Sequence, residues 1–167
     1  KWLYDNVNVY DSYPREGLVY AGEYAAHVAE AGAGKFNAPE SNVWEGALAE
    51  AAFMTGMERN ADVVVMKSYA PLLARLGYTQ WSPDMIWFDG KSAFGSASYY
   101  VQKLYSLYTG DVSYPVRTDA PDVYASATSR GDLTFVKVVN AGDRAQTADV
   151  EADFPFGEMI RIVRMEG

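Results

Sequence analysis

The sequence predicts an α/β region followed by a β-rich region. Up to about residue 110, apolar runs alternate with helix-forming stretches, as in parallel strands joined by crossover helices. Beyond residue 111, short β-prone runs separated by turn signals indicate antiparallel hairpins. A closed eight-stranded barrel needs roughly 250 residues, more than the 167 present. We therefore expect the C-terminal part of a (β/α)8 TIM barrel, residues 1–110, followed by part of an antiparallel β-sandwich, residues 111–167.

The composition excludes several classes of function. The chain has 14 Lys and Arg against 22 Asp and Glu, a formal net charge of -8, so nucleic acids and anionic membranes are not expected as partners. It has no Cys, a single His, and no P-loop, dinucleotide or zinc motif, so we expect no metal and no cofactor. The apolar run at residues 63–66 is far shorter than the roughly 18 residues that span a bilayer.

The first elements are a helical stretch and a strand. Residues 2–13 carry apolar side chains at loosely helical spacing and end at a Tyr-Pro pair. Residues 18–22 form a short apolar run, which predicts a buried strand that ends on Glu23. Residues 31–39, rich in Gly, Ala and Pro, predict a loop.

A long helix is expected next. Asn42, followed three residues later by Glu45, is typical of a capping box and predicts the start of a helix. The good helix formers of residues 44–60 predict its body. On this helix we expect Glu45, Glu50 and Glu58 to be solvated or to form salt bridges.

A second strand and a last helix complete the α/β region. Residues 62–66 lack alternation, which predicts a strand buried on both faces, and residues 68–71 end it. The stretch that contains Trp81 is expected to be irregular. Ser96 predicts the N-cap of another helix, and Gly110 its C-terminal stop. In the β-rich region, strands are predicted over residues 123–127, 133–139 and 159–164, with turns at residues 130–132 and 140–143 between them.

Three residues near the predicted strand ends could carry chemistry. Reactive groups of (β/α)8 barrels lie at the carboxyl ends of strands, where Glu23 would be, although a Glu there can equally be an ordinary solvated residue. His27 could act as a general base or as a structural hydrogen-bonding group. Tyr69, which ends the second strand, could bind a sugar or could pack in the core.

Several blocks of the chain closely resemble, in order and spacing, the α-L-arabinofuranosidases of glycoside hydrolase family 51. These blocks are residues 10–13, 21–26, 47–64, 68–72, 81–89 and 98–104, with a further similarity at residues 136–140. The resemblance implies a retaining glycosidase with Glu23 as nucleophile at the end of barrel strand seven. In such enzymes a second carboxyl group, roughly 5 Å away, protonates the leaving oxygen and then activates water.

The resemblance also implies the surroundings of Glu23. The strand over residues 62–66 would be barrel strand eight, and Tyr69 would lie near the arabinose pocket. His27 aligns near a position where relatives place a substrate-facing aromatic ring. Tyr24, His27 and Tyr69 are therefore the candidate substrate-binding residues, and a poly- or oligosaccharide is the expected partner.

One departure from the family pattern is large. The acid/base of the family is the Glu of an Asn-Glu pair at the end of strand four, and no Asn-Glu pair occurs in this sequence. The chain also begins with Lys1 rather than Met and carries no signal peptide. We therefore expect a fragment of a longer enzyme that is inactive by itself. Its two open barrel strands would expose apolar faces, so we expect self-association into a homo-oligomer or rearranged packing.

The parent is expected to remove terminal α-L-arabinofuranosyl residues from arabinan or arabinoxylan, without a cofactor, in an extracellular or periplasmic location. Two alternatives remain at this point. One is a retaining barrel glycosidase of other sugar specificity, such as a xylosidase or endo-glucanase. The other is a carbohydrate-binding or structural module without chemistry of its own, which the β-rich tail and the many aromatic residues allow.

Overall fold

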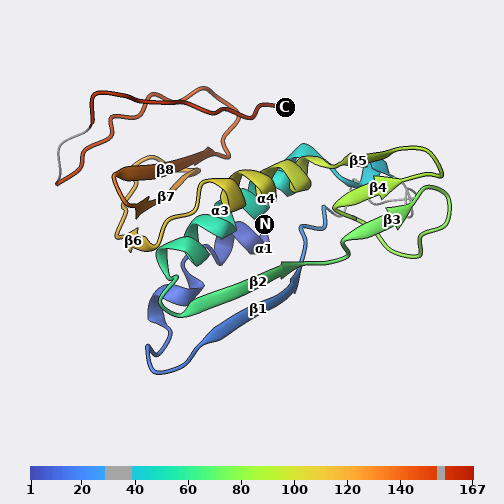
Figure 1. Ribbon diagram of the computed structural model, residues 1–167, viewed down its shortest axis with the longest axis horizontal. Coiled ribbons are helices and arrows are strands. Elements are labelled where there is room, and N and C mark those ends of the chain that lie inside the picture. Colours follow the sequence, from blue (N-terminus) through green and yellow to red (C-terminus); the bar gives the residue numbers. More distant parts are fainter. Residues whose placement is uncertain (29–38, 154–156) are drawn as a thin grey trace.

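The computed structural model describes residues 1–28, 39–153 and 157–167. Figure 1 shows two helices, α3 and α4, crossing the centre of the molecule. A pair of strands, β1 and β2, lies on one side of these helices, a sheet of β6, β7 and β8 on the other, and a small sheet of β3, β4 and β5 at one end. The loop predicted at residues 31–39 lies almost wholly outside the described residues.

The amino-terminal helical stretch is present as two short pieces. α1 spans Trp2–Asp5 and the 3-10 helix η1 spans Val9–Ser12. Between them, the Asn6 side-chain amide donates a hydrogen bond to the Trp2 carbonyl oxygen at 2.8 Å. Leu3 and Tyr10 are buried against α3, so these pieces are held by tertiary packing rather than by helical length.

The two strands that were predicted for the α/β region are parallel, as expected. β1, Val19–Tyr24, pairs with β2, Val64–Tyr69, and α3 lies between them in the sequence. The prediction that β2 starts at Asp62 and is buried on both faces is wrong. β2 begins at Val64, and Met66 is 59% exposed, because α3 covers only one face of the pair.

α3 spans Trp44–Arg59, close to the predicted bounds. The predicted cap is wrong: Val43 is the N-cap, and no side chain caps the helix. The Asn42 side chain instead accepts a hydrogen bond from the Trp87 indole N–H at 2.7 Å. A tertiary contact thus replaces the helix cap that the local sequence predicted.

Packing on several sides explains the burial of α3. One core cluster joins its Ala47, Ala51 and Met54 to α4 and β8, and a second joins Ala49 and Phe53 to α1, η1 and β2. A helix that is packed on opposite faces shows no single apolar stripe. The spacing of apolar residues in α3 therefore does not predict which of its polar residues are buried and which are exposed.

The three glutamates of α3 differ in environment. Glu45 is exposed, as predicted. Glu58 forms the expected salt bridge, 2.6 Å from Lys137. The prediction for Glu50 is wrong, since this residue is 1% exposed and forms a hydrogen bond with a backbone N–H.

α4 spans Ala97–Leu107, and Ser96 is its N-cap as predicted, accepting a hydrogen bond from the Tyr99 N–H. The predicted stop, Gly110, lies beyond the C-cap Tyr108. A Cβ on Gly110 would come within 2.5 Å of the Ser129 backbone. The glycine is therefore needed where the chain passes close to β7.

A small sheet replaces the irregular stretch that was predicted around Trp81. Its strands are β3, Leu73–Arg75, β4, Ile86–Phe88, and β5, Ala93–Gly95. β3 and β4 are parallel, and β4 and β5 are antiparallel. Strands of three residues are too short to show an alternating pattern in the sequence. Trp87 of β4 is fully buried, but its burial depends on the tertiary structure and could not be predicted from its neighbours in sequence.

The β-rich region forms a sheet of β6, Val112–Tyr114, β7, Val123–Arg130, and β8, Leu133–Asn140. All pairings are antiparallel, and Gly131, at φ +55°, makes the predicted turn between β7 and β8. The strand predicted over residues 159–164 is wrong, because no strand occurs within the described residues 157–167. β propensity forms no strand without a pairing edge.

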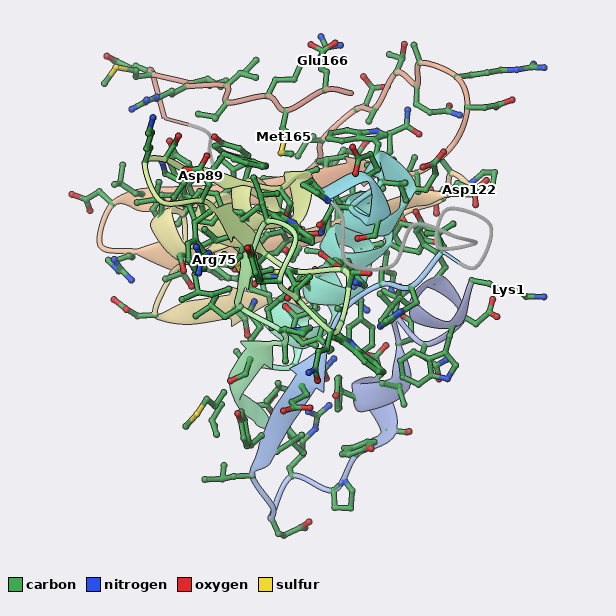
Figure 2. The ribbon with its side chains drawn as sticks, turned by 90° about the vertical axis from the view of Figure 1, so that its right-hand side faces the viewer. Lys1, Arg75, Asp89, Asp122, Met165 and Glu166 are labelled. Carbon is green, nitrogen blue, oxygen red and sulfur yellow. The ribbon has the colours of Figure 1, made fainter. Side chains whose placement is uncertain are left out.

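The C-terminal segment lies along the molecule as an extended coil (Figure 1). In Figure 2, Met165 points from this segment towards the rest of the molecule and Glu166 points away from it. Met165 packs against the cluster formed by α3, α4 and β8.

Candidate active site at the carboxyl ends of β1 and β2

The predicted site residues lie around the carboxyl ends of two parallel strands. Glu23 is the penultimate residue of β1 and is exposed. The next residue, Tyr24, pairs in register with Tyr69, the last residue of β2. The two strands therefore bring Glu23, Tyr24 and Tyr69 to one edge of the sheet.

Tyr24 and Tyr69 lie on the helix side of this edge. Their rings meet edge to face with centroids 6.0 Å apart, and the Tyr24 hydroxyl accepts a hydrogen bond from the Gln102 side-chain amide at 2.7 Å. Burial raises the pKa of both phenols well above the ordinary value of 10.0. The two phenols are therefore neutral. Their rings pack against each other at the carboxyl ends of β1 and β2, where Glu23 also lies.

His27 follows β1 in the sequence and is exposed. Its ring meets Trp81 edge to face, with centroids 6.0 Å apart, and Trp81 is 60% exposed. The sequence pattern left Trp81 in an irregular stretch. Only the folded chain places it beside the segment that follows β1.

Glu50 is the residue near this edge that sequence reasoning missed. Its Oε1 accepts a hydrogen bond from the Ala26 N–H at 2.8 Å. Burial raises its pKa to about 7, and the hydrogen bond from the Ala26 N–H opposes this rise. Its Oε2 and the Tyr69 hydroxyl are both buried without a hydrogen-bond partner among the residues that the structure describes. The one sequence signal was a Glu set among alanines in the middle of a helix.

Asp84, in the connection between β3 and β4, is a second buried carboxyl group. It is 1% exposed, and burial raises its pKa to about 6. Its charge also contributes to the raised pKa of Tyr69, as does that of Glu50. Two buried acids, one from α3 and one from this connection, thus act on the same phenol.

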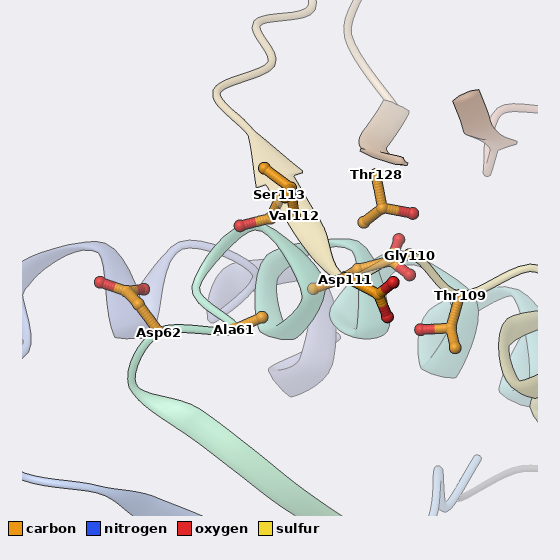
Figure 3. Close-up of a pocket in the computed structure, with 9 residues that line it drawn as sticks. Ala61, Asp62, Thr109, Gly110, Asp111, Val112, Ser113 and Thr128 are labelled. Atoms are coloured by element: carbon orange, nitrogen blue, oxygen red, sulfur yellow. The ribbon is translucent and has the colours of Figure 1, made fainter. Parts of the chain in front are cut away.

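A separate cavity of about 240 Å³ lies away from these residues. Figure 3 shows Ala61 and Asp62 before β2 on one side and Gly110 to Ser113 on the other. The cavity lies at the amino end of β2, and Glu23 lies at the carboxyl end of parallel β1, so they occupy opposite edges of the sheet.

The acidic groups that line this cavity have cationic partners. Asp62 pairs with Arg15 at 3.1 Å, and Asp111 pairs with Arg130 at 3.4 Å. Glu58, which also lines it, pairs with Lys137. The cavity therefore presents no uncompensated charge, and it is the weaker candidate for a site.

The described residues contain no group of three or more His, Asp or Glu side chains placed to hold a metal ion. Within the same residues, no helix is long and apolar enough to cross a membrane. The candidate residues around the β1–β2 edge carry a carboxylate, two phenols and an imidazole.

Comparisons with known proteins agree on one family. A family model described as the α-L-arabinofuranosidase C-terminal domain matches residues 22–164. An extracellular exo-α-L-arabinofuranosidase of Streptomyces chartreusis is 46% identical over 135 residues, which are 80% of this chain and 15% of that protein. The α-L-arabinofuranosidase A of Aspergillus niger is 36% identical over 157 residues, 92% of this chain and 23% of that protein.

A solved structure is also similar. The arabinose-bound α-L-arabinofuranosidase MgGH51 superposes with a TM-score of 0.75 at 39% sequence identity, covering 87% of this chain and 25% of that one. The chain thus spans less than a quarter of the length of the two relatives named above. As its resemblance to glycoside hydrolase family 51 predicted, the chain belongs to the family of α-L-arabinofuranosidase C-terminal domains.

Proposed function

We propose that this chain is part of a retaining α-L-arabinofuranosidase, with Glu23 as its nucleophile. The observation that carries the proposal is the position of Glu23, exposed at the carboxyl end of a strand that pairs in parallel with the next one. That is the edge where (β/α)8 enzymes place their reactive groups. The names of the relatives support arabinofuranosides as the substrate class.

The proposed architecture divides the chain at residue 110. Residues 1–110 supply strands seven and eight of the barrel, β1 and β2, with their helices, and residues 111–167 supply part of the β-sandwich. The exposed side chains of Tyr20 and Met66 support this, because they leave an apolar sheet face uncovered on the side away from α3. In the isolated chain this face leads to self-association.

The proposed reaction is a double displacement. A Glu23 carboxylate oxygen attacks the anomeric carbon, and the bond from that carbon to the leaving oxygen breaks as the acid/base protonates this oxygen. Water, deprotonated by the same acid/base, then attacks the anomeric carbon and releases Glu23 as a carboxylate. The acid/base belongs to a part of the enzyme outside this chain, so the chain alone is inactive.

The remaining roles follow from the same geometry. Tyr24 and Tyr69 shape the arabinose pocket behind Glu23, and exposed His27 contacts substrate together with Trp81. The substrates are terminal α-L-arabinofuranosyl groups of arabinan- or arabinoxylan-type polysaccharides, and the reaction needs neither metal nor cofactor. The Streptomyces relative is named as extracellular, which supports an extracellular parent.

The test is hydrolysis of 4-nitrophenyl α-L-arabinofuranoside and of the matching β-D-xyloside. We expect the full-length protein to hydrolyse the arabinofuranoside with the higher kcat/KM. The 167-residue chain should be inactive alone and active after mixing with the missing amino-terminal segment. A preference for the xyloside would overturn the substrate class, and activity of the chain alone would overturn its assignment as a fragment.

A further inference from the structure

We propose that Glu50 is a positioning residue for Glu23, because its carboxyl group holds the backbone N–H of Ala26 and so fixes the path of the chain that leaves β1. The inference rests on the proposed role of Glu23 as nucleophile. It concerns a side chain on α3, the helix that packs against β1 and β2.

The contact lies where the β ladder ends. Tyr24 is the last residue of β1, and its carbonyl oxygen accepts a hydrogen bond from the Ala70 N–H at 3.3 Å. Ala26 is two residues further on, outside the strand, and Glu50 Oε1 accepts its N–H at 2.8 Å. Glu23 is therefore followed by two hydrogen bonds that hold the backbone, one from the residue after β2 and one from α3.

The helix also lies close to this segment. A Cβ on Gly46, one turn before Glu50, would lie 3.5 Å from both Cβ and O of Ala26. Ala26 itself packs against the core cluster that contains Phe53. The hydrogen bond from Ala26 thus forms in a packed environment, where loss of one partner leaves the other group unsatisfied.

The environment of Glu50 is an expensive one for a carboxyl group. Burial raises its pKa to about 7, and the group that opposes this rise, the Ala26 N–H, is uncharged. A leucine at this position would avoid the desolvation cost. What leucine cannot provide is an acceptor that reaches Ala26.

The expected consequence is kinetic. A reacting group displaced by about 1 Å can lose about 100-fold in rate. Loosening the segment after β1 would displace the Glu23 carboxylate relative to the anomeric carbon. It would lower kcat more than it raises KM, because the sugar-binding walls at Tyr24 and Tyr69 remain in place.

The experiment compares Glu50→Gln and Glu50→Asp in the full-length protein with 4-nitrophenyl α-L-arabinofuranoside. Gln keeps the length of the side chain and the acceptor but not the charge, whereas Asp keeps the charge but is one methylene shorter. We expect kcat of Glu50→Gln to stay within about threefold of wild type and kcat of Glu50→Asp to fall about 10-fold or more. KM should stay nearly constant in both variants.

Glu58→Asp is the matched control. Glu58 is on the same helix and is nearly as buried, but it contacts Lys137 and Ser126 of the β6–β8 sheet instead of the β1 segment. Its shortening should lower the melting temperature without changing kcat. An equal fall in kcat in both Asp variants would mean a general effect of helix damage and would overturn the inference.

Amide hydrogen exchange at Ala26 in the wild-type protein tests the contact directly, even if Glu50→Asp does not fold. We expect the Ala26 amide to be protected, and exchange at the rate of a free peptide would overturn the inference. The two proposals also fail separately. A full-length protein that does not hydrolyse arabinofuranosides, or keeps activity without Glu23, refutes the proposed function. An active protein that requires Glu23 but keeps full kcat in Glu50→Asp refutes only the role of Glu50.

Discussion

The Lys137 ammonium lies 2.6 Å from the Glu58 carboxylate, although 79 residues separate them in the sequence. The Ser126 hydroxyl also donates to Glu58, and the Lys137 Nζ lies 5.2 Å from the centre of the Tyr105 ring. The two side chains are only 11% and 9% exposed. This network joins α3, from the α/β region, to the sheet of the β-rich region.

Removing the cation from this network should destabilise the protein strongly. Lys137→Met removes the salt-bridge partner of the buried Glu58 carboxylate, which keeps the Ser126 hydroxyl and the more distant charge of Lys67. We expect a loss of about 3 kcal/mol in the free energy of unfolding, at the lower end of the range for broken buried ion pairs. Urea titration of the full-length protein measures it. Arg130→Ala breaks an exposed pair with Asp111, and it should cost less than about 1 kcal/mol. Equal losses in both variants would contradict burial as the cause.

Glu23→Ala in the full-length protein should abolish turnover, because it removes the carboxylate that the proposed mechanism uses to attack the anomeric carbon. Added azide should restore cleavage of an activated aryl arabinofuranoside, because azide attacks the anomeric carbon as the aryl oxide leaves. The product should be the glycosyl azide of inverted configuration, since the anion enters from the face that Glu23 vacates. Glu45→Ala, at an exposed position on α3, should keep wild-type rates. More than a few per cent of wild-type activity in Glu23→Ala without azide would refute the nucleophile assignment.

Stability should depend on pH through Glu50. Its pKa rises from the ordinary value of 4.5 to about 7 in the folded state, so between these values the folded protein binds more protons than the unfolded one. This contribution is complete below about pH 4.5 and is lost as the pH rises to about 7.

The pH effect can be isolated by comparing the wild type with Glu50→Gln, because Asp84 titrates in both. The two proteins should be about equally stable near pH 4 and should differ by pH 8, where Glu50→Gln is the more stable by up to about 3 kcal/mol in the free energy of unfolding. Glu45→Gln, at an exposed position, should show no such separation. Parallel pH profiles for the wild type and Glu50→Gln would show that burial does not raise this pKa.

Gly56→Ala should destabilise the protein although it improves local helix propensity. In an isolated helix the change would gain about 1 kcal/mol. In the folded chain the new Cβ would overlap the Val7 carbonyl oxygen. We expect a net loss of about 1–3 kcal/mol, measured by thermal melting. Gly17→Ala, with open space around it, is the control and should be nearly neutral. A stabilised Gly56→Ala would show that Val7 can move away.

Elements with a strong local pattern were predictable. The helix bodies, the strands β1 and β2, the β7–β8 hairpin and the Ser96 cap all depend on residues near in sequence, and the structure has them close to the expected positions. The strands β3, β4 and β5 were not predictable, because three residues show no period and their pairing connects segments from Leu73 to Gly95.

Part of the candidate site was likewise predictable from local sequence, and part was not. The exposed carboxylate of Glu23 follows from a short apolar run that ends in an acid, and the family resemblance follows from the order of local blocks. Neither the apolar run nor the family resemblance indicates which α3 side chains pack against the end of β1. Glu50 has the same helical context as Glu45 and Glu58, yet one is solvated, one is paired with Lys137 and one is buried against Ala26.

Local chemistry, then, was enough to place the helices, the strands β1, β2, β7 and β8, and the acid near the end of β1. Only the folded chain decided that Asn42 binds Trp87 instead of capping α3, that residues 159–164 find no strand to pair with among the described residues, and that Glu50 reaches Ala26. The physical reason is that propensity and periodicity act over a few residues. Burial, pairing and pKa depend on neighbours that are distant in sequence and brought close by packing.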